Sequence, residues 1–174
     1  MNTPVTPDQL CQYLSERGIG YHRTDHPAVF TVAETAPHRD EMVGHHTKNL
    51  FLKDKKGRLF LVSAEAHARI DLKRLHETIG ASGRLSFGSA ELLMEKLGVT
   101  PGSVTAFAVI NDHARDVTMV LDANLMTGEE VNFHPLINTA TIRVGRDDFL
   151  AFLRQVGHEP LIVDLPVPPD GQNG

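Results

Sequence analysis

Cysteine is nearly absent from this chain of 174 residues. Its single cysteine, Cys11, cannot form an intramolecular disulfide, so the fold does not depend on an oxidising compartment. No stretch approaches the roughly 20 consecutive apolar residues of a membrane-spanning helix. The N-terminus lacks the charged and then apolar pattern of a secretory signal. These absences predict a cytoplasmic protein without a membrane partner, in which Cys11 is a packing residue.

An excess of basic residues is also missing. The chain has 17 Lys and Arg against 22 Asp and Glu, which gives a formal net charge of -5. A protein that binds nucleic acid through its overall charge would be basic, so DNA is not an expected partner. A local basic patch can still act within a negative total.

The motifs of metal-dependent and covalent hydrolases are missing as well. There is no cysteine cluster of the zinc-binding type, and the adjacent His45 and His46 would point to opposite faces of a strand. There is no Gly-x-Ser-x-Gly motif around a nucleophilic serine. We therefore expect neither a metal ion nor an organic cofactor, and no covalent intermediate.

The length and the 41% hydrophobic content suit one compact domain, which we place at residues 1–165. The Pro- and Gly-rich segment 166–174 is expected to be a disordered tail. Capping residues and apolar periodicity predict helices at 7–17, 32–36, 71–79, 89–97 and 146–156. Apolar and β-branched runs predict strands at 19–25, 49–53, 58–62, 85–87, 104–110, 117–121, 130–133, 140–144 and 161–163. This pattern predicts an α/β fold with a single mixed, mostly antiparallel sheet flanked by helices.

Three short motifs occur along the chain. They are Thr-Lys-Asn-Leu-Phe-Leu at 47–52, Leu-Gly-Val-Thr-Pro-Gly-Ser-Val-Thr at 97–105 and Asn-Phe-His-Pro-Leu at 132–136. In this order they resemble the YbaK/ProX family of aminoacyl-tRNA deacylases, free-standing relatives of the editing domain of bacterial prolyl-tRNA synthetase. The resemblance covers roughly residues 21–157, and the second and third motifs are most similar to the ProX-type branch.

The resemblance implies both a fold and a function. The sheet would be strongly bent, with the ligand pocket at its open side. The ProX-type branch hydrolyses alanine from mischarged tRNA for proline, so tRNA would be the substrate and prolyl-tRNA synthetase a candidate partner. An enzyme acting on another small aminoacyl-tRNA, such as cysteinyl- or seryl-tRNA, is an alternative. A non-catalytic module that binds tRNA or a nucleotide is a second alternative, which the net negative charge favours.

The same resemblance assigns catalytic roles to three residues. Lys48 would anchor the phosphate of the terminal adenosine or orient the ester, although a lysine at a strand end also commonly extends to solvent. Asn49 would hydrogen bond to a carbonyl or ribose hydroxyl. Gly102 would donate its N–H to the developing oxyanion. The family has a Gly-x-x-x-Pro loop, but here Ala106 replaces the proline, so the loop loses one source of rigidity.

The remaining site residues would bind the substrate. His134 would contact the amino group of the substrate or close a small pocket around its side chain. Ser103 belongs to the loop of Gly102, and Val29, Phe30, Val32 and Phe133 are candidate pocket walls, although each also suits the core. The basic residues Lys53, Lys55, Lys56 and Arg58 lie on one predicted hairpin and are candidate tRNA contacts, with a solvated hairpin tip as the alternative.

Overall fold

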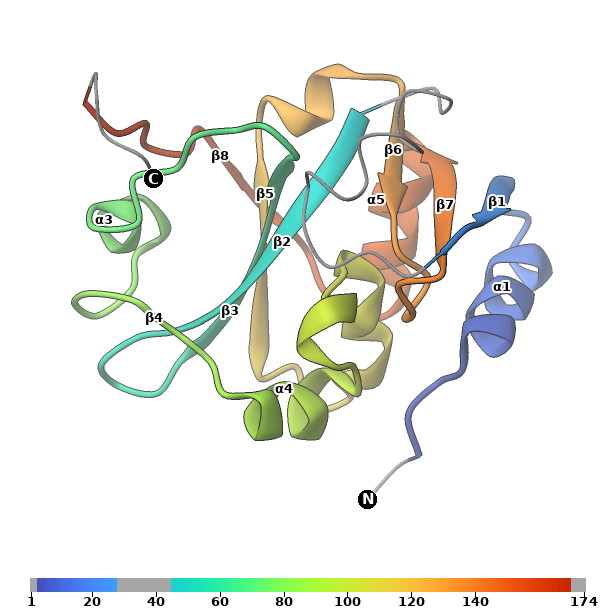
Figure 1. Cartoon of the computed structure of the whole chain (residues 1–174), viewed down its shortest axis with the longest axis horizontal. Coiled ribbons are helices and arrows are strands. Elements are labelled where there is room, and N and C mark those ends of the chain that lie inside the picture. Colours follow the sequence, from blue (N-terminus) through green and yellow to red (C-terminus); the bar gives the residue numbers. More distant parts are fainter. Residues whose placement is uncertain (1–2, 28–44, 170–174) are drawn as a thin grey trace.

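The computed structural model describes residues 3–27 and 45–169. These residues form a mixed sheet of eight strands in the order β1-β7-β6-β2-β3-β5-β8, with β4 paired to β2 (Figure 1). The predicted mixed, mostly antiparallel sheet is confirmed, because four of the seven strand pairings are antiparallel. The sheet is open, with β1 and β8 at its edges. The strands are β1 (Tyr21–Asp25), β2 (His45–Lys53), β3 (Leu59–Glu65), β4 (Ser86–Phe87), β5 (Val117–Asp122), β6 (Glu130–Phe133), β7 (Ala140–Gly145) and β8 (Leu161–Val163).

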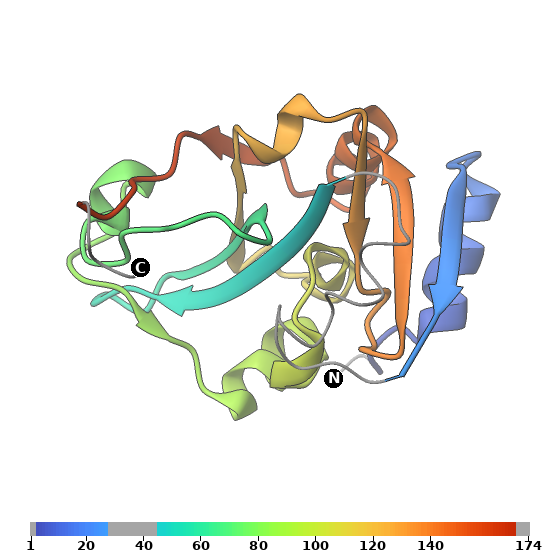
Figure 2. The same cartoon turned by 45° about the horizontal axis from the view of Figure 1, so that its top comes forward.

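Strand β2 joins the two halves of the sheet. Its first residues, His45 and His46, pair with β6, whereas Thr47 to Lys53 pair with β3. Figure 2 shows β2 running obliquely between the β1, β7 and β6 group and the β3, β5 and β8 group. This change of partner along one strand bends the sheet between its two halves.

Two of the helices begin at the capping residues that the sequence predicts. The Thr6 side chain accepts the N–H of Gln9, and Gln9 returns a hydrogen bond to the Thr6 N–H, which forms a capping box. Ser89 caps helix α4 (Ala90–Leu97), and Gly98 ends it in the left-handed conformation with φ of 67°. The helices are α1 (Pro7–Glu16), α3 (Leu75–Ile79), α4 (Ala90–Leu97) and α5 (Arg146–Gln155).

Two sequence predictions differ from the structure. Residues 104–110, predicted as a strand, contain the start of a 3₁₀ helix, η2 (Ala106–Asn111). Thr105 initiates it, since its side chain accepts the Phe107 N–H at 3.3 Å and its carbonyl accepts the Ala108 N–H at 3.1 Å. A short, fully buried apolar run does not distinguish a strand from a helix, so the strand prediction was wrong. The helix predicted at 71–79 forms only from Leu75 onward.

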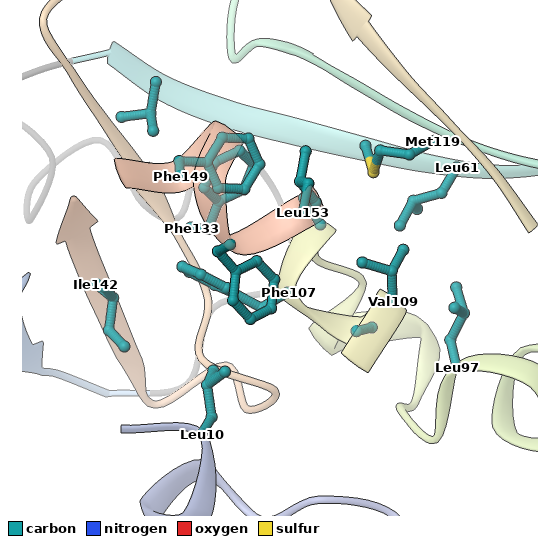
Figure 3. Close-up of a cluster of buried hydrophobic side chains, with 14 of the residues drawn as sticks. Leu10, Leu61, Leu97, Phe107, Val109, Met119, Phe133, Ile142, Phe149 and Leu153 are labelled. Atoms are coloured by element: carbon teal, nitrogen blue, oxygen red, sulfur yellow. The ribbon is translucent and has the colours of Figure 1, made fainter. Parts of the chain in front are cut away.

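The two faces of the sheet are covered by separate hydrophobic clusters. The larger cluster packs α1, α4, η2 and α5 against one face. Figure 3 shows its centre, where the Phe133 and Phe149 rings stack at 4.6 Å and Phe107 packs edge-on against both. The smaller cluster packs Leu75 and Ile79 of α3 against the other face. The alternation of each strand therefore decides which cluster a given side chain joins.

A buried carboxylate connects three elements beneath the larger cluster. Asp112, at the end of η2, accepts a hydrogen bond from the His158 Nε2 at 2.8 Å and from the Val117 N–H at 2.8 Å. It also accepts the Asp116 N–H at 3.0 Å. The side chains of Asp112 and His158 are only 2% and 3% exposed. This pair therefore ties the start of β5 to the segment that follows α5.

Three further predictions concern the ends and the loops of the chain. The first residues of the predicted tail pack against the segment before α3, because the Pro166 carbonyl accepts the Asp71 N–H at 2.7 Å and Pro168 is buried. Within residues 3–27 and 45–169, no helix has the length and apolar character needed to cross a membrane. The helix predicted at 32–36 lies outside the described residues.

Candidate functional site

Lys48 lies on the face of the sheet that carries the smaller cluster. It pairs with Ala64 and shares its side of β2 with Leu50 and Leu52, both of which contact that cluster. The half-buried Lys48 ammonium donates a hydrogen bond to the Ala68 carbonyl. Lys48 therefore lies across the turn that follows β3 and is not fully extended into solvent.

The turn beneath Lys48 is fixed by its own hydrogen bonds. The Glu65 carbonyl accepts the Ala68 N–H at 2.9 Å, and the Glu65 side chain accepts the His67 N–H at 2.8 Å. The Ala66 N–H binds the His46 carbonyl at 2.8 Å, which attaches the turn to β2. The carbonyl that holds the Lys48 ammonium is consequently part of a rigid element.

The Lys48 ammonium is a cation without a direct ion pair among the described residues. Partial burial lowers the pKa of Lys48 below its ordinary value, and the nearby charge of Glu65 partly opposes this change. A lysine in this state has unused hydrogen-bond donors and a charge that a phosphate or carboxylate would neutralise.

Asn49 faces the opposite side of β2. It pairs with Ser63, and the Ser63 hydroxyl donates to the Asn49 side-chain oxygen. The strand alternation expected from the sequence therefore separates Asn49 from Lys48. Asn49 connects β2 and β3 at the residue next to Lys48, and its amide nitrogen is the group that could donate to a ligand.

His134 follows β6 directly. Its Nδ1 lies 2.9 Å from the Ala140 carbonyl. Because a carbonyl oxygen only accepts, Nδ1 carries the proton, and the Nε2 of the neutral ring is left as an acceptor. Burial lowers the pKa of His134, an effect that the Ala140 carbonyl opposes and the neighbouring His26 reinforces. The His134 ring is therefore a neutral hydrogen-bond acceptor at neutral pH.

Lys48 and His134 lie on the same face of the sheet. Phe133 points into the larger cluster, so the alternation of β6 turns Asn132 and His134 to the other side. Asn132 pairs with His46, which is two residues from Lys48 on β2. The Thr47 hydroxyl donates to the Asn132 carbonyl at 2.7 Å and holds the two strands together.

His26 and Thr141 extend this polar face, although no sequence motif points to either residue. The His26 ring lies 6.2 Å from the His134 ring, and its Nε2 is 2.8 Å from the Thr141 hydroxyl. His22 and His26 have the four-residue spacing of many zinc sites, but His22 belongs to an extended strand, where that spacing does not place two side chains together. The described residues hold no group of three or more potential metal ligands.

Gly102 lies on a different element, the short 3₁₀ helix η1 (Pro101–Ser103). Its φ is not positive, so its own backbone does not require glycine. Ser103 is buried, and its N–H binds the Thr100 carbonyl at 2.9 Å. In place of the absent proline at Ala106, the hydrogen bonds of Thr105 fix the loop. Hydrogen bonds between described residues do not join Gly102 to Lys48 or His134.

Of the four candidate pocket walls, Phe133 is the one within the described residues. Phe133 is 1% exposed and stacked in the core, so it can shape a site only by positioning the adjacent His134. Val29, Phe30 and Val32 lie outside the described residues.

The basic hairpin is organised around a buried carboxylate. Asp54 accepts N–H groups from Lys56, Arg58 and Ser82 and the Arg58 side chain at 3.0 Å. Burial alone would raise the pKa of Asp54, but these hydrogen bonds lower it to about 2. Arg58 is thus held by Asp54, although its side chain is still 53% exposed, whereas Lys53, Lys55 and Lys56 are exposed and have no ion pair among the described residues. The three lysines are therefore the hairpin cations that a polyanion can bind without competing with a buried carboxylate.

Comparisons with known proteins identify the family and the fold of this chain. The family model described as the aminoacyl-tRNA editing domain matches residues 26–152. The chain is 41% identical over 159 residues to the prolyl-tRNA synthetase associated domain-containing protein 1 of Xenopus laevis, covering 89% of this chain and 94% of the relative. It is 37% identical over 153 residues to the prolyl-tRNA editing protein ProX of Acetoanaerobium sticklandii, covering 87% and 93%. A solved structure described as a candidate trans-editing enzyme for prolyl-tRNA synthetase has the same fold, with a TM-score of 0.67, 23% identity and coverage of 92% and 98%.

Proposed function

The chain belongs to the aminoacyl-tRNA editing domain family and is an aminoacyl-tRNA deacylase, and from this premise we propose that it acts in trans to remove alanine from mischarged tRNA for proline. The names of its relatives support the tRNA for proline. The observation that carries the proposal is the shared face of Lys48 and His134, where a cation lies on the same side of the sheet as a neutral acceptor.

The two groups suit the two ends of an aminoacylated adenosine. We assign the Lys48 ammonium to the phosphate of the terminal nucleotide, which it binds as a point charge. The His134 Nε2 accepts a hydrogen bond from the α-ammonium group of the amino acid. Binding both groups fixes the ester between them, and such positioning is a large part of the catalysis of an already activated acyl group.

The hydrolysis step needs no covalent intermediate. A water molecule attacks the ester carbonyl, and the adjacent ribose hydroxyl accepts its proton while passing its own proton to the departing ester oxygen; the Gly102 N–H stabilises the oxyanion. Cleavage of the C–O bond releases alanine and returns a hydroxyl to the tRNA. Asn49 supports this arrangement through Ser63, which fixes the spacing of β2 and β3 beside Lys48. We further propose that prolyl-tRNA synthetase, which forms such mischarged products, is a partner.

The lowered pKa of His134 predicts a specific pH dependence. Because its pKa lies below the ordinary 6.5, the decrease of kcat/KM that comes from protonating the His134 ring should have its midpoint below pH 6.5. Below pH 6.5, protonation removes the Nε2 lone pair and kcat/KM should fall. The measurement is a pH profile of kcat/KM with the wild type and the His134→Gln variant, whose amide does not titrate. A decrease centred above pH 6.5, or the same decrease in both proteins, would contradict this role.

The substrate assignment is tested by comparing tRNAs for proline charged with alanine or with proline. We expect kcat/KM to be at least about tenfold higher for alanyl-tRNA, because a pocket sized for a methyl group rejects the larger ring. Cysteinyl- and seryl-tRNA are the controls for other small acyl groups. Faster hydrolysis of either control, or equal hydrolysis of the alanyl and prolyl esters, would overturn the alanine assignment.

A further inference from the structure

Phe87 is an aromatic side chain whose exposure the core does not explain. It belongs to the two-residue strand β4 and is 63% exposed, more than any other large apolar residue that the structure describes. Its neighbours in the chain, Ser86 and Gly88, carry no apolar surface that would extend a hydrophobic patch. A lone exposed aromatic ring lacks the contiguous apolar area of a protein interface.

The ring lies on the same side of the sheet as Lys48. Phe87 pairs with Leu52 in antiparallel register, and paired residues point to the same face. Leu52 and Leu85 both pack in the smaller cluster, on the Lys48 side. Two independent neighbours of Phe87, one across the pair and one two residues earlier, thus assign it to the face that carries the proposed site.

Two lysines of the basic hairpin lie near β4. It borders the end of β2 that leads into the basic hairpin (Figure 1). Lys53 pairs with Ser86, next to Phe87, and the alternation of β2 turns its side chain to the opposite face, so it can reach the phosphates only around the edge of β4. The aliphatic part of Lys55 lies over Gly83, where an added Cβ would come within 2.6 Å of the Lys55 Cδ. An exposed ring with lysines beside it matches the usual composition of a single-stranded nucleic-acid site, in which aromatic rings stack on bases and cations contact phosphates.

The spacing along β2 also fits such a strand. Lys48 and Leu52 are four positions apart, which corresponds to about 13 Å along the strand. A stacked strand advances by about 3.4 Å per nucleotide, so three or four nucleotides span this distance. The unpaired 3′ end of a tRNA has that length. With its terminal adenosine at Lys48, its first unpaired base reaches β4.

We propose that Phe87 is a stacking platform for the first unpaired base of the tRNA 3′ end, three nucleotides from the terminal adenosine. This inference rests on the proposed placement of the terminal nucleotide at Lys48. Base stacking on an aromatic ring tolerates any base, so Phe87 contributes to affinity and to the path of the strand and does not choose the amino acid.

The test compares the binding of two RNA hairpins with the acceptor-stem sequence of tRNA for proline, one with a four-nucleotide single-stranded 3′ end and one blunt. The Phe87→Ala variant should bind the first hairpin about tenfold more weakly than the wild type and the blunt hairpin equally well. The Phe87→Trp variant should restore binding. Met94→Ala, which removes an exposed apolar side chain on α4, is the matched control and should change neither affinity.

If Phe87→Ala binds the first hairpin as tightly as the wild type, or loses the same affinity for both hairpins, the proposal that Phe87 stacks on an unpaired base is wrong. The hairpins carry no amino acid, so the result does not depend on which acyl group the enzyme removes. Failure to hydrolyse alanyl-tRNA would therefore refute the proposed substrate and leave this comparison intact. Normal hydrolysis with unchanged hairpin binding would refute the platform alone.

Discussion

Replacing Lys48 with alanine is expected to lower kcat/KM for deacylation of alanyl-tRNA at least tenfold while leaving the thermal midpoint nearly unchanged. The ammonium has no direct ion pair among the described residues, and its one protein hydrogen bond, to the Ala68 carbonyl, is partly exposed to water. Its removal therefore costs the fold little. Loss of a charge-assisted contact to the substrate, in contrast, raises the barrier of the reaction directly. Steady-state kinetics and thermal unfolding of the same preparations measure the two effects.

Lys53→Ala is the matched control for Lys48, because it removes a lysine from the same strand without touching the Ala68 turn. It should leave kcat unchanged and weaken tRNA binding modestly, in a salt-dependent way. The Lys48→Arg variant separates charge from geometry, since the wider guanidinium retains the charge but does not fit a site shaped for an ammonium. A thermal midpoint that falls sharply in Lys48→Ala would show that the lysine is structural.

The Asp112→Ala variant is expected to lose about 3 kcal/mol of unfolding free energy, because it leaves the His158 ring and the Val117 N–H buried without their acceptor. For a chain of this size the thermal midpoint should fall by about 10 °C. Chemical denaturation at constant pH measures the free energy. The activity per folded molecule should be preserved, since the hydrogen bonds of Asp112 go to Asp116, Val117 and His158 and to none of the proposed site residues.

The pKa of Asp112 adds a pH dependence to this prediction. Burial alone would raise it, but the hydrogen bonds from His158, Val117 and Asp116 bring it below its ordinary value of 3.8. The corresponding stability is present above pH 3.8 and is lost as the pH falls through the lower folded-state pKa. Asp112→Ala should remove this part of the acid sensitivity. Asp116→Ala, which deletes an exposed carboxylate, should change stability by no more than about 0.5 kcal/mol; an equal loss in both variants would refute the special role of the buried pair.

Capping and turn preferences of single residues correctly predicted helix ends, because these ends depend on contacts between near neighbours in the sequence. Thr6, Ser89 and Gly98 mark the helix ends because their hydrogen bonds or dihedral angles involve only near neighbours. The strand predicted at 104–110 failed because every residue from Ala106 to Val109 is buried, and uniform burial erases the periodicity that separates strand from helix. The parallel pairing of β2 with β6 could not be predicted from local sequence patterns either, since it joins residues about 86 positions apart.

The candidate site was only partly visible in the sequence for the same reason. The resemblance selected Lys48 and His134, but not the Glu65 to Ala68 turn that holds the ammonium or the Ala140 carbonyl that sets the His134 tautomer. These partners use backbone atoms, which any residue type can supply. Strand alternation correctly separated Asn49 from Lys48. The commitment of Arg58 to Asp54 was hidden because a run of basic residues reveals nothing of what each one contacts.

Strand β2 should accept the insertion or deletion of an even number of residues but not of an odd number. Lys48 and the Leu52 partner of Phe87 share one face only because an even number of positions separates them. One residue added or removed between them would rotate Lys48 into the aromatic core or Leu52 out of its cluster, whereas a change of two residues would keep both faces and alter only the reach. Length variation in this strand is therefore expected to occur in steps of two.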